Sequence, residues 1–545
     1  MSLGTTDTTQ PPSEISQGKS GQNRASLIHM RIKRALDVLV PEAVHWDDTG
    51  AGADARISPI SVRPLPKVPN ASPKDLSKAS ERARRAQKTW AATHPLARAR
   101  ILLRFHDAVL RNRDYLLDII QAESGKARVH AFEEISDVVL TARYYARVSA
   151  RALAPKARRG AIPLATRVEV NRNPKGVVGI ISPWNYPLTL AVSDAIPALM
   201  AGNAVVLKPD SLTPLSAFAI KDVLVQAGLD PELFQIVPGP GRELGPALIE
   251  TSDYVMFTGS SATGATIAQQ CAARLIDFSA ELGGKNPMIV LPDADIDAAA
   301  RGATIACFSN AGQLCVSIER IYVHRHIYDQ FVARFLAHTR DMRVEASLDW
   351  DTDMGVLVSP EHLDKVHAHV RDALGKGARA LAGGTPLPDI APNAYAPTIL
   401  ENVTPDMDVY AQETFGPVVA LYPVDSEAQA IGLANSTQYG LNASVWSTPA
   451  RGRELARHLR AGTVNVNEGY AATWASMDAP MGGMGISGVG RRHGIEGLLK
   501  YTEAQTIATQ SSLVPLSTPP GMGAQQWAQF MADFFTVARH IPFMK

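Results

Sequence analysis

The residues most able to do chemistry lie in six short segments of the chain. A glutamate, Glu281, comes directly before a Gly-Gly pair, and a cysteine, Cys315, follows an Asn-Ala-Gly run. A thiolate is a strong nucleophile and a positioned carboxylate is a general base, so together they could carry out covalent catalysis that ends in hydrolysis. The six segments are 183–187 (PWNYP), 207–211 (LKPDS), 257–260 (FTGS), 281–287 (ELGGKNP), 310–315 (NAGQLC) and 413–417 (ETFGP).

Three other patterns suggest familiar sites but depart from them. Segment 239–245 reads GxGxxxG, one residue longer than the dinucleotide fingerprint, and segment 259–266 has P-loop glycine spacing without the lysine. His362, His367 and His369 lie in a charged helical pattern, which favours a solvated helix over a metal site. We therefore expect no metal.

In their order along the chain, the six segments resemble the aldehyde dehydrogenase superfamily over about residues 60–505. Longer runs such as NAVVLKPDS, SAELGGKNPMIV and FSNAGQLC are similar to bacterial NADP-type succinate-semialdehyde dehydrogenases. The resemblance implies an α/β fold with a Rossmann-like cofactor domain, a second α/β catalytic domain and a small β oligomerisation arm.

The resemblance also implies three catalytic roles. Cys315 would attack the aldehyde, because a hydride leaves a tetrahedral alkoxide far more easily than a planar aldehyde carbon. The Asn185 amide and the backbone N–H of Cys315 would hold the alkoxide oxygen, and Glu281 would activate the water that hydrolyses the thioester. The alternative readings are a buried cysteine, a turn asparagine and a surface glutamate. Cys271 and Cys307 fit the packing role.

A nicotinamide dinucleotide is the cofactor that the resemblance implies. Lys208 would reach the adenosine ribose, Glu413 would hold the nicotinamide ribose, and Ser260 would open a helix whose N-terminal dipole suits a pyrophosphate. The expected cofactor-binding residues are Trp184, Asn185, Lys208, Pro209, Asp210, Ser211, Gly259, Ser260, Leu282, Glu413 and Phe415.

Ser211 bears on the choice between NADP and NAD. NAD-preferring relatives often carry glutamate there, which would bind both ribose hydroxyls and repel a 2′-phosphate. Serine removes that charge, so we expect NADP, with NAD possible. Asp210 would weaken this preference if its carboxylate pointed inward.

The expected substrate is a small aldehyde, with succinate semialdehyde favoured by the resemblance. Well-known enzymes of that type grip the substrate carboxylate with two arginines, and here those positions are Ser193 and Ser309. Uncharged aliphatic or aromatic aldehydes are therefore the alternative, with Tyr186 and Trp474 as apolar walls. A non-catalytic structural relative and a cysteine-dependent ester hydrolase are two further alternatives.

The pattern of strands and helices must position these residues. From 176 to 283, short apolar runs alternate with helical patterns, which predicts a parallel sheet covered by helices. One continuous helix is expected over 188–201. The predicted division is a disordered tail at 1–28, a cofactor-binding domain at 29–154 and 175–283, an oligomerisation arm at 155–174 and 500–520, a catalytic domain at 284–499 and a C-terminal amphipathic helix at 521–545.

Composition narrows the possible binding partners and cellular locations of the protein. The 545 residues include 54 Lys+Arg and 53 Asp+Glu, and this balance of +1 argues against a nucleic-acid partner. The chain contains no run of about 18 uncharged apolar residues, so we expect no integral membrane segment. Three cysteines and no apolar leader indicate a cytoplasmic protein. The arm implies a homodimer or homotetramer, and the C-terminal helix would cap the body, form an interface or contact a membrane.

The Ser211 argument predicts the effect of one substitution. In Ser211→Glu, the NADP-to-NAD ratio of kcat/KM should fall roughly 10- to 100-fold, because a carboxylate would face the 2′-phosphate. Steady-state kinetics with both cofactors measures the ratio. Ser211→Ala, which adds no charge, serves as the control, and an unchanged ratio in Ser211→Glu would contradict the assignment.

Overall fold

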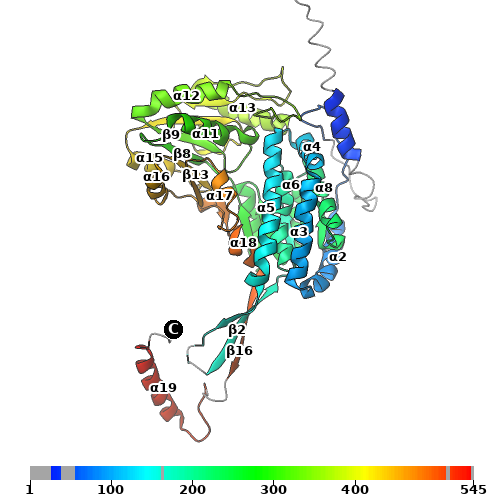
Figure 1. The fold of residues 1–545 in the computed structure, drawn as a ribbon, viewed down its shortest axis with the longest axis vertical. Helices are drawn as coiled ribbons and strands as arrows, with labels where there is room; N and C mark the ends of the chain where they lie inside the picture. Colours follow the sequence, from blue (N-terminus) through cyan, green and yellow to red (C-terminus); the bar gives the residue numbers. More distant parts are fainter. Residues whose placement is uncertain (1–25, 38–55, 161, 163–164, 511–515, 542–545) are drawn as a thin grey trace, which may run out of the picture.

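The computed structural model describes residues 26–37, 56–160, 162, 165–510 and 516–541 (Figure 1). Most of the predicted 1–28 tail lies outside these residues. Residues 26–28, however, begin a helix that spans 26–37, so the tail prediction is wrong for them. The reason is the apolar spacing of Ile28, Ile32, Ala35 and Leu36, which gives this helix one face that packs on the body.

A six-stranded sheet carries the first part of the site. Its order is β15-β7-β6-β3-β4-β5, and all strands except β15 are parallel. The sequence order reverses between β6 and β3, and ligands bind at the carboxyl ends of strands at such a point. The strands are β3 (Val177–Ile181), β4 (Ala204–Lys208), β5 (Phe234–Ile236), β6 (Tyr254–Thr258), β7 (Asp277–Glu281) and β15 (Gly488–Val489).

Helices cover both faces of this sheet, as the βαβ pattern predicts. Ser72 and Asp75 form a reciprocal capping box at the start of α2. The helices are α2 (Pro73–Ala92), α3 (Pro95–Arg111), α4 (Arg113–Ser124), α5 (Arg128–Leu153), α8 (Pro214–Gln226), α9 (Gly241–Thr251), α10 (Ser261–Ala273) and α18 (Gly494–Leu499).

The single helix predicted over 188–201 is wrong. The structure has two short helices, α6 (Pro187–Val192) and α7 (Ala195–Met200). Pro197 explains the break, because it has no N–H to donate to the carbonyl of Ser193 and its ring would clash with that carbonyl in a continuous helix. The break places Ser193 and Asp194 at a bend beside the site.

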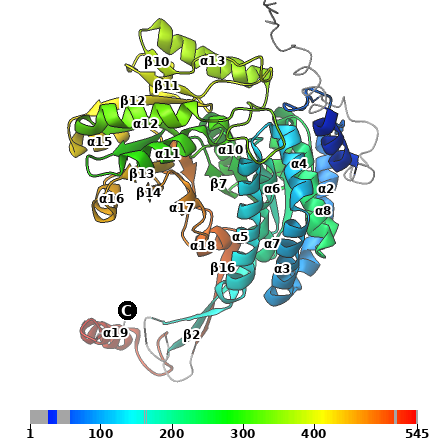
Figure 2. The same cartoon turned by 45° about the horizontal axis from the view of Figure 1, so that its top comes forward.

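A seven-stranded sheet forms the second layer, in the order β10-β11-β12-β9-β8-β13-β14 (Figures 1 and 2). Only β10 is antiparallel to its neighbour. The strands are β8 (Asn286–Val290), β9 (Ile318–His324), β10 (Arg379–Ala382), β11 (Thr398–Glu401), β12 (Val418–Val424), β13 (Asn442–Trp446) and β14 (Thr463–Val466). The helices are α11 (Ile296–Phe308), α12 (Tyr328–Arg340), α13 (Pro360–Gly375), α14 (Asp408–Ala411), α15 (Glu427–Ala434), α16 (Pro449–Ala456) and α17 (Ala471–Trp474).

A third sheet projects from the body. Strands β1 (Lys156–Arg158), β2 (Thr166–Pro174) and β16 (Thr502–Gln510) pair antiparallel in the order β1-β2-β16. Beyond it lies α19 (Ala524–Ala538), which has no buried residue and stands away from the body (Figure 1). The interpretation of this helix as a cap on the body is therefore wrong.

The elements found do not by themselves test the proposed domain boundaries, which stay a prediction.

Across the described residues, every helix is too short or too polar to cross a bilayer.

Candidate active site

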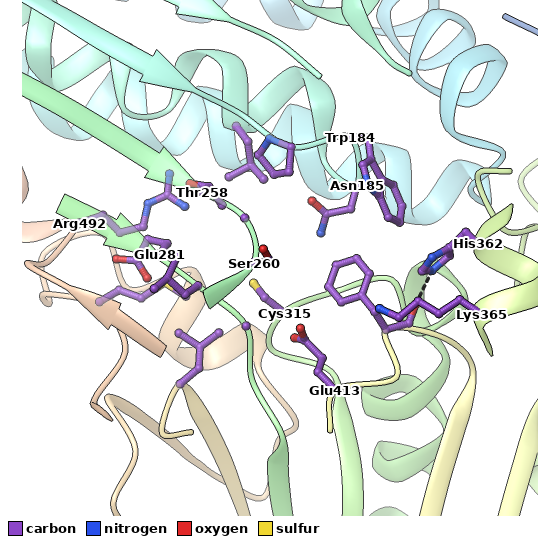
Figure 3. Close-up of a pocket in the computed structure, with 18 residues that line it drawn as sticks. Trp184, Asn185, Thr258, Ser260, Glu281, Cys315, His362, Lys365, Glu413 and Arg492 are labelled. Carbon is purple, nitrogen blue, oxygen red and sulfur yellow. Dashed lines mark hydrogen bonds between the residues drawn. The ribbon is translucent and has the colours of Figure 1, made fainter. Parts of the chain in front are cut away.

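One cavity gathers most of the residues that the sequence singles out. It lies at the carboxyl ends of β3, β6 and β7, where the two large sheets meet (Figure 3). Of the predicted catalytic and cofactor residues, it is lined by Trp184, Asn185, Gly259, Ser260, Glu281, Leu282, Cys315, Glu413 and Phe415. Five of the six segments, which lie far apart in the sequence, therefore converge on one place.

Cys315 lies in the loop between α11 and β9 and is partly buried. Burial raises the pKa of its thiol to about 12, and the negative charges of Glu413 and Glu281 act in the same direction. At neutral pH the sulfur is therefore protonated, and it needs a base to become a nucleophile. Cys271 and Cys307 are buried among apolar side chains, as the packing interpretation predicts.

The loop before Cys315 has a strained backbone. Asn310 and Ala311 have φ values of 51° and 53°, in the left-handed region that costs non-glycine residues about 1–2 kcal/mol each. The Asn310 side chain compensates by donating to the backbone carbonyl of Asn185 at 3.0 Å. At Gly312, a Cβ atom would lie 2.0 Å from the carbonyl oxygen of Gly416, so only glycine permits this close approach.

Asn185, in the loop after β3, is buried and held from two sides. Its Nδ2 donates to the backbone carbonyl of Gln313 at 3.0 Å, which leaves the second N–H of the amide available. The side chain points into the cavity toward Cys315 (Figure 3). Its own backbone carbonyl accepts from Lys126 Nζ at 2.7 Å and from Asn310 Nδ2.

Lys126 belongs to a fully buried ion pair. Its Nζ lies 2.6 Å from Oε1 of Glu134, and both side chains have no exposed surface. The other carboxylate oxygen accepts from the backbone N–H groups of Leu188 at 2.8 Å and Thr189 at 3.0 Å, in the first turn of α6. Burial lowers the pKa of Lys126 and raises that of Glu134, and each charge opposes the shift of the other. The pair thus ties α5, Asn185 and α6 together.

Glu281 ends β7, and its side chain is 5% exposed, which rules out the surface-glutamate interpretation. Burial raises its pKa to about 7, while the positive charges of Arg492 and Lys500 oppose the rise. Arg492 also lines the cavity, forms an ion pair with Asp194, and donates to the hydroxyl of Ser193 at 2.9 Å. Sequence reasoning assigned no role to Arg492, which lies in the glycine-rich run 488–494 (GVGRRHG).

A second buried ion pair holds the segment that contains Glu413. Lys285 pairs with Glu319, whose carboxylate accepts the backbone N–H groups of residues 414–415. Glu413 then accepts from the backbone N–H of Gly284 at 2.8 Å. Burial raises the pKa of Glu413 to about 7, with the charge of Glu319 adding to the effect.

Four predicted cofactor residues follow the end of β4 and do not line this cavity: Lys208, Pro209, Asp210 and Ser211. The Lys208 side chain is 5% exposed, and its ammonium group has no hydrogen-bond partner among the described residues. Ser211 donates to the carbonyl of Gly239 at 3.3 Å. Asp210 accepts from the backbone N–H of Leu212 at 2.9 Å, so one carboxylate oxygen already bonds within its own turn.

The histidine cluster needs a correction. His362, His367 and His369 do lie on one helix, α13, but His362 is not on a solvated face. It packs edge-on against Trp184, and its Nε2 lies 2.8 Å from the carbonyl of Phe415 (Figure 3). Burial lowers its pKa to about 4. Among the described residues, no three potential ligand side chains cluster to hold a metal.

A second cavity opens on the other side of Cys315. Tyr186 and Trp474 line it, as predicted, together with Glu133, Asp137 and Arg492, among others. The prediction of a purely apolar wall is wrong for Tyr186, whose hydroxyl donates to Glu133 at 2.8 Å. An acidic side chain on α5 thus makes this wall polar.

The two serines in place of arginines lie at the edge of this second cavity. Ser309 bonds to the hydroxyl of Tyr470, which lines the cavity, at 3.0 Å, and Ser193 bonds to Arg492. The guanidinium group of Arg492 therefore lies next to one of the two positions where the expected arginine is missing. It comes from the C-terminal part of the chain, which sequence spacing could not reveal.

Comparison with known proteins agrees with this geometry. Residues 46–507 match the aldehyde dehydrogenase family. The chain belongs to that family.

Individual relatives cover most of the chain. A protein of Mycolicibacterium smegmatis, provisionally named as an NADP(+) succinate-semialdehyde dehydrogenase, is 53% identical over 88% of this chain and 93% of its own length. A Mycobacterium tuberculosis protein with the same type of name is 52% identical over the same shares.

Solved structures of the family have the same fold. An Escherichia coli NADP-dependent enzyme superposes with a TM-score of 0.81 at 32% identity, covering 86% of this chain and 96% of that one. A betaine aldehyde dehydrogenase of Staphylococcus aureus in complex with NAD+ superposes with a TM-score of 0.83 at 28% identity, covering 90% and 99%. The predicted fold class is confirmed.

The contact between Lys126 and Asn185 predicts the effect of Lys126→Met. Removing the ammonium group leaves Glu134 buried without its charge partner, which should lower the free energy of unfolding by roughly 3–5 kcal/mol. It also frees the Asn185 carbonyl, so kcat should fall by about 10-fold or more while KM changes little. Denaturant unfolding and steady-state kinetics measure the two effects.

A matched control uses Lys88, an exposed lysine on α2. Lys88→Met should change neither quantity. Loss of stability in Lys126→Met without any loss of kcat in the folded fraction would mean that the pair does not position Asn185.

Proposed function

We propose that the chain oxidises an aldehyde to a carboxylic acid with NADP, through a thioester on Cys315. The observation that carries the proposal is the convergence of Cys315, Asn185 and Glu281 on one cavity. A nucleophile, an oxyanion donor and a general base are the three groups that this reaction needs from the protein.

The residues present fit a nicotinamide dinucleotide. Lys208 supplies a buried side chain whose ammonium group makes no hydrogen bond to the described residues and has Asp210 as its nearby charge, and Ser260 caps the N-terminus of α10 beside the cavity. Such an N-terminus favours a phosphate, and Glu413 suits a ribose hydroxyl. The bound cofactor would supply the acceptor for the hydride. With Ser211 in place of a glutamate, we propose NADP as the preferred form and NAD as a usable one.

The first step forms the carbon–sulfur bond. Glu281 accepts the proton of Cys315 as the sulfur attacks the aldehyde carbon, and the carbonyl electron pair moves to the oxygen. The second N–H of the Asn185 amide and the backbone N–H of Cys315 stabilise that alkoxide. The alkoxide then expels a hydride and leaves a thioester.

The second step releases the acid. Glu281, after it has passed the first proton to solvent, takes a proton from water, and the hydroxide adds to the thioester carbon. The carbon–sulfur bond then breaks, and the thiolate of Cys315 takes up a proton. A carboxyl group with a pKa of about 7 can act in both steps, because it is partly ionised near neutral pH.

Succinate semialdehyde is the proposed substrate, because relatives of 52–53% identity carry that name. Arg492, which is bonded to Ser193 and paired with Asp194, lines the cavity and would face its carboxylate. Uncharged aldehydes are the second candidate, because Ser193 and Ser309 stand where the resemblance implies that well-known succinate-semialdehyde dehydrogenases have arginines. We further propose a cytoplasmic homodimer or homotetramer, for which the projecting sheet of β1, β2 and β16 would supply the contact.

The Cys315→Ala variant tests the mechanism. It should lose NADP-linked aldehyde oxidation by at least about 1,000-fold, because no other group forms the thioester. The measurement is NADPH absorbance with succinate semialdehyde, propanal, hexanal and benzaldehyde. Cys307→Ala is the matched control and should keep activity. Oxidation retained in Cys315→Ala would refute the mechanism, and the ranking of the four aldehydes decides between the two substrate candidates.

The pKa of Glu281 predicts a pH dependence. A base works only when ionised, so thioester hydrolysis should rise with pH through about 7 and level off about one unit above it. In Glu281→Gln, a first turnover should still release NADPH slowly, and steady-state turnover should then fall by roughly 100-fold or more. Rapid-mixing kinetics separates the two phases. A wild-type profile that is flat between pH 6 and 8 would contradict the role of Glu281.

A further inference from the structure

The second cavity contains a carboxylate that the proposed mechanism does not use. Glu133, on α5, is partly buried and lines this cavity together with Cys315. Its Oε2 accepts from the hydroxyl of Tyr186 and its Oε1 from the hydroxyl of Tyr470, each at 2.8 Å. A carboxylate can accept about four hydrogen bonds, so two phenols leave it able to bind a further donor.

The two phenols keep Glu133 in place. Burial raises the pKa of Tyr186 and that of Tyr470 well above the ordinary value, so both hydroxyls stay protonated and act as donors. Ser309 bonds to the same Tyr470 hydroxyl. Where the resemblance to succinate-semialdehyde dehydrogenases leads us to expect an arginine, this chain therefore has a serine connected through a tyrosine to a glutamate. The ionisable group on this wall is therefore an acid, whereas an arginine would have placed a positive charge there.

The neighbouring cations are already paired with other carboxylates. Lys126 binds Glu134, and Arg492 binds Asp194. Within the described part of the chain, no lysine, arginine or histidine nitrogen lies within ion-pairing distance of Glu133. A cation that enters the cavity would therefore meet a carboxylate that makes no ion pair, on which the charge of Lys126 acts from a distance and whose pKa burial raises.

Asp137 adds a second acid one helical turn further along α5. Residues four apart on a helix share a face, and Asp137 also lines this cavity. Asp137 is 3% exposed, its Oδ2 is bonded to Thr189, and its Oδ1 has no hydrogen-bond partner among the described residues. An unpaired buried oxygen is costly, so the face of α5 toward the cavity favours donors and positive charge.

We propose that this cavity takes a further class of substrate, aldehydes that carry an ammonium group at the end distant from the carbonyl, with Glu133 as the charge partner. The proposal rests on the proposed function, because Cys315 oxidises the aldehyde end by the same steps. A carboxylate-bearing aldehyde would use the wall of Arg492, and an ammonium-bearing aldehyde would use the wall of Glu133.

The test compares three aldehydes of similar size. These are 3-aminopropanal, its uncharged analogue butanal, and succinate semialdehyde, assayed by NADPH formation with the full-length enzyme. The wild type should favour 3-aminopropanal over butanal in kcat/KM by roughly 10- to 100-fold, the range that a hydrogen bond to a charged group allows. In Glu133→Gln this preference should disappear while kcat/KM for butanal stays within about twofold.

Glu81→Gln, which neutralises an exposed glutamate on α2, is the matched control and should keep the preference. A wild type that oxidises butanal but shows no preference for 3-aminopropanal would overturn this inference alone. So would a Glu133→Gln variant that keeps the preference. Failure to oxidise any of the three aldehydes would overturn the proposed function itself.

A binding measurement on the wild type covers the case in which Glu133→Gln does not fold. The propylammonium ion should inhibit butanal oxidation competitively, with an inhibition constant at least about tenfold below that of 1-propanol. Equal inhibition by the two compounds would overturn the inference.

Discussion

The buried ion pair of Lys126 and Glu134 is the interaction on which the active-site geometry depends. Two charged groups without contact with water are stable only when they pair with each other and when their remaining hydrogen-bond donors and acceptors also have partners. Here the remaining donors and acceptors are the Asn185 carbonyl and two N–H groups at the start of α6. The condition that keeps the pair stable therefore also fixes Asn185, the residue proposed to face the developing alkoxide.

The same arrangement recurs around the cavity. Lys285 and Glu319 hold the segment of Glu413, and Arg492 with Asp194 lies beside Glu281. Each pair joins segments that are distant in sequence, at least one of which is a loop. Loops alone would not hold side chains to within a fraction of an ångström, whereas ion pairs in a dry interior have few alternative arrangements.

Much of the site could be predicted from the sequence because its residues lie in local motifs. Buried parallel strands read as short, largely apolar runs, and Asn185 and Ser260 lie in the loops that follow β3 and β6, while Glu281 ends β7. Arg492, His362 and Glu133 could not be found in this way. Each lies in a helix or loop with ordinary local composition, and each reaches the cavity only through packing of that element against another.

The sequence by itself determined the chemistry: a thiol, an amide and a carboxylate in recognisable segments, on an α/β pattern. Only the tertiary structure decided the environment of those groups. Burial, which depends on contacts between distant segments, raises the pKa of Cys315 and of Glu281. The charge of the substrate cavity was decided in the same way. The sequence showed two missing arginines, whereas the fold placed Arg492 near one of those positions and Glu133 near the other.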